Sequence, residues 1–407
     1  HWYFIFGGSA EPLYHLHQPP TGLGISPNTV EAARFAMSTM YMHWTFTPYG
    51  IYTLTGLMFA LVYYNLKQPF SLGSLLYPLL GERVHGPIGN AIDAICLYSL
   101  VAGMAASLGA GILTIAGGLD KLLNIADTPF TLGMITIAIV ATFVISAASG
   151  LLKGISVLAN INIIAFLVIC VFVFVFGPTL FLLQFGVESL GDYAVNFFQR
   201  SLYTGAIVDS DWVNSWTIFY WANWLAWTPV TALFLGRLSY GYTVRDYINY
   251  NLLLPALFGC VWMIVFSGTA IYLDFFGTQS PLYQVLQNKG PENVMYAVFD
   301  ELPLPQVMSI FFLLVSFLSY VAGADANTSA MGGISSTGIS PSSPEPSFLI
   351  KLIWGMVVGL IAWIMVAFAG IDGIKMTSNL GGFPALFLVL AVSFGMIRMI
   401  RRGMLKE

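Results

Sequence analysis

The sequence predicts an all-α membrane protein, because a very apolar composition is combined with repeated apolar stretches long enough to cross a bilayer. Of its 407 residues, 57% are hydrophobic and only 8% are charged, and the mean hydropathy is +0.79. Soluble globular domains carry about 25% charged residues, so a soluble fold is excluded. The net charge of −4 is spread thinly along the chain, which gives no reason to expect a nucleic-acid partner.

Apolar stretches of about 20 residues are long enough to form transmembrane helices. They predict nine complete spans, at 43–65, 89–118, 131–151, 156–183, 216–240, 251–275, 303–328, 348–370 and 377–399. Residues 1–10 are expected to be the second half of a truncated span, because the chain opens on apolar residues without an initiator Met or a basic signal region. Two segments with charges on one helical side are expected to lie in the membrane interface, 28–42 and 187–206.

The basic residues predict the orientation of these spans. When residues 398–406 are placed in the cytoplasm, ten of the fifteen Lys and Arg residues fall on the inner side of the membrane. Cytoplasmic loops carry an excess of Lys and Arg. We therefore expect a cytoplasmic C-terminus.

The chain is predicted to consist of two inverted halves. Residues 1–186 contain the truncated first helix and four spans, 187–206 form the interfacial helix, and 207–407 contain five spans and a short basic cytoplasmic tail. An odd number of spans in each half inserts the second half upside down relative to the first. Inverted repeats of this kind place their substrate near the bilayer mid-plane, between broken helices.

The stretch 216–240, WTIFYWANWLAWTPVTALFLGRLSY, carries the densest group of aromatic residues. Tyr220, Trp224 and Trp227 are spaced i, i+4 and i+7, so they share one face of a helix. Pro229 follows and removes a backbone hydrogen bond. Such a face suits a cation without N–H groups, because aromatic rings attract its charge without hydrogen bonds. The alternative is that these rings pack the core or form an interfacial belt.

A second aromatic group lies at HWTFTPYGIY in the span 43–65. Trp44, Tyr49 and Tyr52 surround Pro48, so two aromatic faces, each beside a proline, could enclose one methylammonium group. An interfacial belt is again the alternative, and it is stronger for Trp44 than for Tyr52, which lies two turns deeper.

Several motifs resemble the betaine/carnitine/choline transporter (BCCT) family: GGSAEPLYH, HWTFTPYGIYTLTGL, SGLLKGISVLANIN, WTIFYWANWLAWTP followed by RLSYGYTVRDYI, and FLSYVAGADANTSAMGG. The resemblance implies a twelve-span secondary transporter with a leucine-transporter-like core of two inverted five-helix repeats, whose first two helices are absent from this sequence. It also implies a bacterial inner-membrane protein, commonly a homotrimer, that moves trimethylammonium compounds with sodium or by exchange.

The resemblance also assigns site residues. Trp44, Tyr49 and Tyr52 match three aromatics of the family's fourth helix, although the family usually has Trp at the place of Tyr49. Trp224 and Trp227 match tryptophans of its aromatic box, whereas Asn223 replaces a third one and gives the expected pocket a polar wall. Weaker candidates are Tyr220 and, at the place of the family's glycine-rich helix break, Trp2 and Tyr3.

The coupling ion stays open at this point. Sodium-coupled members of the family resemble one another in a Thr-Ser pair, whose place is taken here by Ala322 and Gly323. Sodium-independent exchangers have an arginine where this chain has Asn162. Sodium is therefore possible without its usual side-chain ligands, and we expect no other cofactor.

Isolated ionisable residues suggest no further site. We expect Glu11 to pair or cap at the outer surface. His15 and His17 are two residues apart and do not share a helix face, so we expect no metal site. Asp325 is expected to be a structural or functional carboxylate inside a span.

We therefore expect a secondary transporter that works by alternating access and whose partners are a small methylated amine and the lipid bilayer. The alternatives are an ion channel and a substrate-gated osmosensor or receptor that uses the same pocket without net transport. An enzyme is not expected, because neither a nucleophile–base pair nor a phosphate-binding loop is visible.

Overall fold

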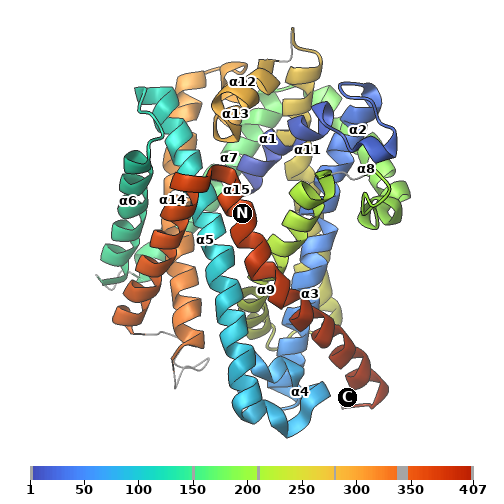
Figure 1. Ribbon diagram of the computed structural model, residues 1–407, viewed down its shortest axis with the longest axis vertical. Coiled ribbons are helices and arrows are strands. Elements are labelled where there is room, and N and C mark those ends of the chain that lie inside the picture. Colours follow the sequence, from blue (N-terminus) through green and yellow to red (C-terminus); the bar gives the residue numbers. More distant parts are fainter. Residues whose placement is uncertain (1–2, 149–151, 209–210, 279–280, 337–346, 405–407) are drawn as a thin grey trace.

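The described part of the chain is helical throughout and contains no strand, which confirms the predicted all-α class (Figure 1). The computed structural model describes residues 3–148, 152–208, 211–278, 281–336 and 347–404. The N-terminal helices are α1 (Tyr3–His17), α2 (Val30–Trp44), α3 (Phe46–Ala60), α4 (Tyr77–Leu80), α5 (Pro87–Leu123), α6 (Pro129–Ala148) and α7 (Leu152–Phe176). The remaining helices are α8 (Thr179–Ser201), α9 (Phe219–Leu238), α10 (Val244–Ile248), α11 (Leu254–Phe275), α12 (Pro281–Lys289), α13 (Val294–Asp300), α14 (Pro305–Ile334) and α15 (Phe348–Arg401).

Short segments of other helical types connect these elements. Turns of π-helix occur at 61–65, 214–218 and 249–253, where they extend α3 and precede α9 and α11. Turns of 3₁₀-helix occur at 21–23, 73–76, 81–85 and 291–293. A π-turn holds one more residue than an α-turn, and such turns often lie at functional sites.

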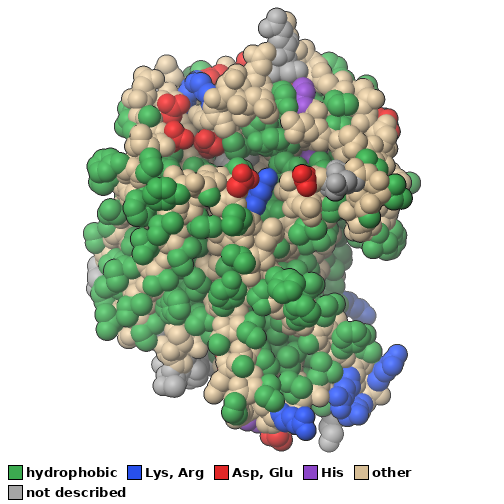
Figure 2. Space-filling model, viewed as in Figure 1, with side chains coloured by type: hydrophobic (Ala, Val, Ile, Leu, Met, Phe, Trp, Pro, Cys, Tyr) green, Lys and Arg blue, Asp and Glu red, His purple; other side chains and the backbone are tan. Residues whose placement is uncertain are grey.

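Five helical segments of the described chain are long and apolar enough to cross a membrane, and a sixth is added if the bent pair α7–α8 counts as one span. The five are Val30–Asn65, Pro87–Leu123, Val244–Phe275, Pro305–Ile334 and Phe348–Arg401. Figure 2 shows hydrophobic side chains over the middle of one face, with charged side chains mostly toward its upper and lower parts. Bands of exposed apolar side chains belong against lipid. The protein is an integral membrane protein.

The two predicted spans 348–370 and 377–399 form one element, α15, which bends sharply between them (Figure 1). Gly370 interrupts the helix with φ 54° and ψ −136°. This backbone conformation is almost restricted to glycine, so the sharp turn depends on this residue.

The expectation that 28–42 lies in the membrane interface is wrong. Its helix, α2, is buried almost along its whole length and packs against α1, α8 and α11. After a break at Thr45 (φ −118°, ψ −107°) it continues into α3. Pro48 lies in the first turn of α3, where a missing N–H is tolerated. Its charged residue Arg34 is partly exposed and forms an ion pair with Glu188 of α8.

The segment 187–206 overlaps the second part of α8. This helix begins earlier, at Thr179, and is bent by 103° from α7. Large apolar side chains such as Val187, Val195 and Phe198 are exposed on it, whereas Leu182 and Phe185 are buried. Elsewhere α3 packs against α9, and α5 packs against α14 and α15. These contacts bring together elements from the first and second parts of the chain.

Candidate functional site

The two aromatic groups meet because α3 lies alongside α9 (Figure 1). Trp44 ends α2, Tyr52 lies on α3, and Tyr220 and Trp224 lie on α9. Trp44, Tyr220 and Trp224 are buried, and Tyr52 is half-buried. The site is therefore built from two segments that are far apart in the sequence.

Four of the expected aromatic residues contact one another as rings. The Trp44 and Trp224 centroids are 5.3 Å apart at 80°, those of Trp44 and Tyr220 are 5.0 Å apart at 61°, and those of Tyr52 and Trp224 are 6.1 Å apart at 84°. These are edge-to-face contacts of the kind that aromatic rings favour. We call Trp44, Tyr52, Tyr220 and Trp224 the aromatic cluster.

Tyr49 and Trp227 are half-buried and pack against the same hydrophobic core, but among the described residues their rings do not contact the aromatic cluster. A Cβ atom on Gly103 of α5 would lie 3.5 Å from Cδ1 of Trp227, which places this indole beside α5. Trp227 thus lies at the contact of α9 with α5, three residues after Trp224, and Tyr49 lies three residues before Tyr52 on α3.

Asn223 is buried and faces α15. Its Oδ1 accepts a hydrogen bond of 3.3 Å from Oγ of Ser378. The two helices approach closely here, because a Cβ atom on Gly382 would lie 2.2 Å from the backbone oxygen of Ala222. Asn223 is therefore hydrogen-bonded to a neighbouring helix, and its role as a polar wall stays a prediction.

The remaining predicted residues lie elsewhere or are not described. Trp2 and the side chain of Tyr3 lie outside the described residues. Ala322 and Gly323 lie within α14. Nδ2 of Asn162 on α7 donates a hydrogen bond of 2.5 Å to Oγ of Ser319, which lies one turn before Ala322 on α14. The positions discussed for ion coupling are therefore close to one another, at the contact between α7 and α14.

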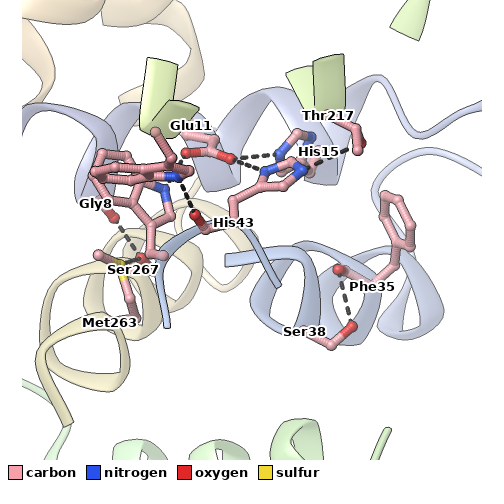
Figure 3. A network of polar contacts seen from close by, with 11 residues as sticks. Gly8, Glu11, His15, Phe35, Ser38, His43, Thr217, Met263 and Ser267 are labelled. Carbon is pink, nitrogen blue, oxygen red and sulfur yellow. Dashed lines mark hydrogen bonds and ion pairs between the residues drawn. The ribbon is translucent and has the colours of Figure 1, made fainter. Parts of the chain in front are cut away.

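Glu11 is not at the outer surface as expected but is buried, with 2% of its side chain exposed. Its Oε2 accepts a hydrogen bond of 2.6 Å from Nε1 of Trp44. Its Oε1 accepts from Nε2 of His15 at 3.1 Å and from Nδ1 of His43 at 2.7 Å (Figure 3). A buried carboxylate is tolerated only when it is paired and hydrogen-bonded, and these three donors fulfil that condition.

The same network holds the aromatic cluster in place. Nε1 of Trp224 donates to the backbone oxygen of His43 at 2.8 Å. The ring of His43 stacks on that of Tyr220, with centroids 4.8 Å apart at 25°. Sequence reasoning missed this network, although the i, i+4 spacing of Glu11 and His15 and the position of His43 next to Trp44 were signals for it.

A small cavity of about 30 Å³ lies beside the cluster. Glu11, Tyr14, Trp216, Tyr220 and Lys375 are among its lining residues. The rings of Tyr14 and Trp216 are 5.1 Å apart, and Nζ of Lys375 lies 5.0 Å from the centroid of the Trp216 ring. The cavity has room for about one water molecule, so in this conformation these side chains close it to a larger solute.

Fold and site together define a helical membrane protein in which buried rings from two spans converge. The chain belongs to the betaine/carnitine/choline transporter family, because the family model described as "BCCT, betaine/carnitine/choline family transporter" matches residues 3–404. This family consists of transporters, so the chain is a membrane transporter and not an enzyme.

Individual relatives are similar over nearly the whole chain. It is 30% identical over 400 residues to a probable glycine betaine transporter of Desulfitobacterium hafniense, covering 98% of this chain and 78% of the relative. It is 31% identical over 399 residues to an ectoine/hydroxyectoine transporter of Virgibacillus pantothenticus, with the same coverage. It is 31% identical over 398 residues to a high-affinity choline transport protein of Escherichia coli, covering 98% of this chain and 58% of the relative.

Proposed function

We propose that the protein is a secondary active transporter of a methylated-ammonium solute, such as betaine, carnitine, choline or a small methylamine. The observation that carries this proposal is the convergence of Trp44, Tyr52, Tyr220 and Trp224 from two membrane segments. The relatives support the solute class, since they are named as transporters of glycine betaine, choline and ectoine.

The ring system suits this solute energetically. A cation over an aromatic face gains roughly 0.5–2 kcal/mol, more when water is excluded. Three or four such contacts support binding in the micromolar-to-millimolar range once the ordering of solute and side chains is subtracted. Tyr49 and Trp227, each three residues along its helix from a ring of the cluster, would line the pocket as it opens, with Asn223 as its polar wall.

The transport mechanism in this proposal is alternating access around a site near the mid-plane. Residues 1–186 and 207–407 form the two inverted repeats, and 187–206 lies along the interface. By analogy with the family, the protein is a homotrimer in a bacterial inner membrane with its C-terminus in the cytoplasm. An osmosensor or receptor without net transport gains no support from the relatives, which are named as transporters.

Uptake into proteoliposomes tests the proposal. Purified protein is reconstituted, and uptake of radiolabelled choline and glycine betaine is measured against protein-free vesicles. We expect uptake of at least one of the two and inhibition by an excess of trimethylammonium compounds. Binding in detergent without uptake would favour the receptor, and an absence of both would contradict the proposed solute class.

A further inference from the structure

The network behind the aromatic cluster contains a set of metal-ligating atoms. One ligand atom each from Glu11, His15 and His43 lies within 4.8 Å of the other two, and all three residues are buried (Figure 3). Two imidazoles and a carboxylate are a common donor set for Zn²⁺ and for other divalent first-row transition metals. We propose that Glu11, His15 and His43 form a binding site for a divalent transition-metal ion.

The spacing of the ligand atoms is close to what such an ion requires. Tetrahedral Zn²⁺ holds nitrogen and oxygen ligands at about 2.0–2.2 Å, which places neighbouring ligands roughly 3.3 Å apart. Oε1 of Glu11 lies 3.1 Å from Nε2 of His15 and 2.7 Å from Nδ1 of His43. Small movements of the two rings away from the carboxylate therefore make room for the ion.

The surrounding groups orient the ligands. Metal-ligating carboxylates and imidazoles are usually held by hydrogen bonds to their remaining polar atoms. Here the second oxygen of Glu11 is held by Trp44, and Nε2 of His43 lies 3.3 Å from Oγ1 of Thr217. The ring of His15 is held by aromatic contacts with Trp216 and Phe35. The ligand atoms are thus positioned before a metal ion arrives.

The carboxylate of the site borders a small cavity that could supply a further ligand. Glu11 lines the small cavity together with Tyr14, Trp216 and Lys375. A water molecule in this cavity is the natural fourth ligand, as in other sites with three protein ligands. Lys375 adds positive charge to the same cavity and opposes the ion, so we expect an affinity of roughly micromolar order rather than that of a structural zinc site.

Charge and atoms balance in the binding step. Without metal, the N–H groups of His15 and His43 donate to Oε1 of Glu11. On binding, those nitrogens present lone pairs to the ion: in a neutral ring the proton moves to the other ring nitrogen, and a ring that was doubly protonated releases one proton to solvent as M²⁺ enters. No bond to carbon changes and no electron is transferred.

Titration with Co²⁺ tests the site in the purified, chelator-treated protein in detergent. We expect one Co²⁺ per chain, with the visible absorption bands of a four-coordinate ion and a higher melting temperature. His15→Gln should weaken binding at least about tenfold. The matched control is His17→Gln, two residues further along α1, because His17 pairs with Asp274 instead of the cluster; it should bind like the wild type. Equal binding by both variants, or no binding by folded wild type at about 1 mM Co²⁺, would overturn the proposal.

A second measurement needs no variant. Electron paramagnetic resonance of the wild type with one equivalent of Cu²⁺ should show coupling to two imidazole nitrogens. Coupling to one nitrogen or none would contradict the ligand set. Neither measurement involves a transported solute, so their outcome is independent of the uptake experiment.

Discussion

Trp224 is held by a hydrogen bond and by two ring contacts within the aromatic cluster. Its indole nitrogen is bonded to the backbone of His43, its ring meets Trp44 edge to face, and Tyr52 approaches it from α3. Its orientation is therefore fixed by contacts with α2 and α3. A ring held in this way presents its π-system to a cation without loss of side-chain entropy on binding.

We expect Trp224→Leu to raise the KM for a trimethylammonium solute about tenfold, because it removes one cation–π contact of up to about 2 kcal/mol while keeping an apolar side chain. The measurement is uptake into proteoliposomes as a function of solute concentration. Trp363→Leu is the control, since this indole bonds to the backbone of Pro129 on α6 and lies outside the cluster. An unchanged KM for Trp224→Leu would show that this ring does not contribute to the binding site.

The rings of the site could be predicted from the sequence because their signal is local. Tyr220 and Trp224 share a face by helical spacing alone, and proximity to Pro48 singled out Tyr52. The structure shows that these rings contact one another, whereas their binding of a solute stays a prediction. The partners of Glu11 were missed, because Trp44 and His43 follow it by more than 30 positions and no periodicity connects them.

At the scale of elements, the sharp turn in α15 depends on one backbone conformation. A Cβ atom at Gly370 would contact nothing within 4 Å, so packing does not require glycine there. The requirement comes from its φ of 54° and ψ of −136°. The sequence predicted two spans here from hydropathy, but it did not reveal that this residue turns the chain.

Gly370→Ala should lower the stability of the folded protein by about 1–3 kcal/mol through backbone strain alone. Gly191→Ala on α8 is the matched control, because a Cβ atom there also contacts nothing but the backbone is helical. That change should be neutral or stabilise the protein slightly. Thermal melting in detergent compares the two variants, and equal melting temperatures would show that the turn carries no strain for alanine.

Glu292, in the short 3₁₀-turn 291–293, has a carboxyl group with a raised pKa. Burial, followed by the charges of Asp127 and Asp120, raises the pKa of Glu292 from 4.5 to about 7. Between about pH 4.5 and pH 7, Glu292 therefore keeps its proton in the folded protein and loses it in the unfolded chain. The contribution of Glu292 to stability is full below about pH 4.5 and is lost as the pH rises through 7.

We expect the melting temperature to fall between pH 5 and pH 8, with Glu292 contributing at most about 3 kcal/mol of this loss. Glu292→Gln keeps the shape of the side chain and cannot ionise, so it should flatten the curve. Glu301→Gln, an exposed change near the end of α13, serves as control. Identical pH curves for Glu292→Gln and the wild type would contradict the raised pKa.

The prediction that failed at this scale was the interfacial position of 28–42. Charges on one side of a helix do not show what covers its other sides. Here the apolar part of the helix is buried against α1, α8 and α11, while Arg34 stays partly exposed and pairs with the exposed Glu188 of α8. Amphipathic periodicity predicts which face of a helix is polar, but whether that face meets lipid head groups, water or another helix depends on the tertiary fold.

At the scale of the whole molecule, the residues at the ion-coupling positions bear on what drives transport. Ala322 and Gly323 offer only backbone oxygens, and the amide of Asn162 is engaged with Ser319 on the same helix as these two residues. A sodium ion needs several oxygen ligands, and hydroxyl groups are missing at both positions. The sequence shows that the family's Thr-Ser pair is absent here, but it does not show which oxygen atoms would bind an ion in its place.

We expect uptake into proteoliposomes to change less than about twofold when sodium is replaced by potassium at constant ionic strength, so that screening of surface charges stays the same. The comparison is made with the same preparation and the same solute gradient. Loss of uptake in potassium would show that sodium is bound by oxygens other than the expected Thr-Ser pair.

The π-turn at 214–218 gives the N-terminal end of α9 one residue more than an α-helical turn would hold. If its hydrogen bonds changed to the α-helical pattern, the chain preceding Phe219 would advance by one residue, which is about 1.5 Å along the axis and 100° around it. Trp216 lies in this turn and Tyr220 lies beyond it. Such a change would swing the indole of Trp216 away from Tyr14 and Lys375 while Tyr220 and Trp224 stay in place, so the small cavity beside them could widen without any loosening of the aromatic cluster.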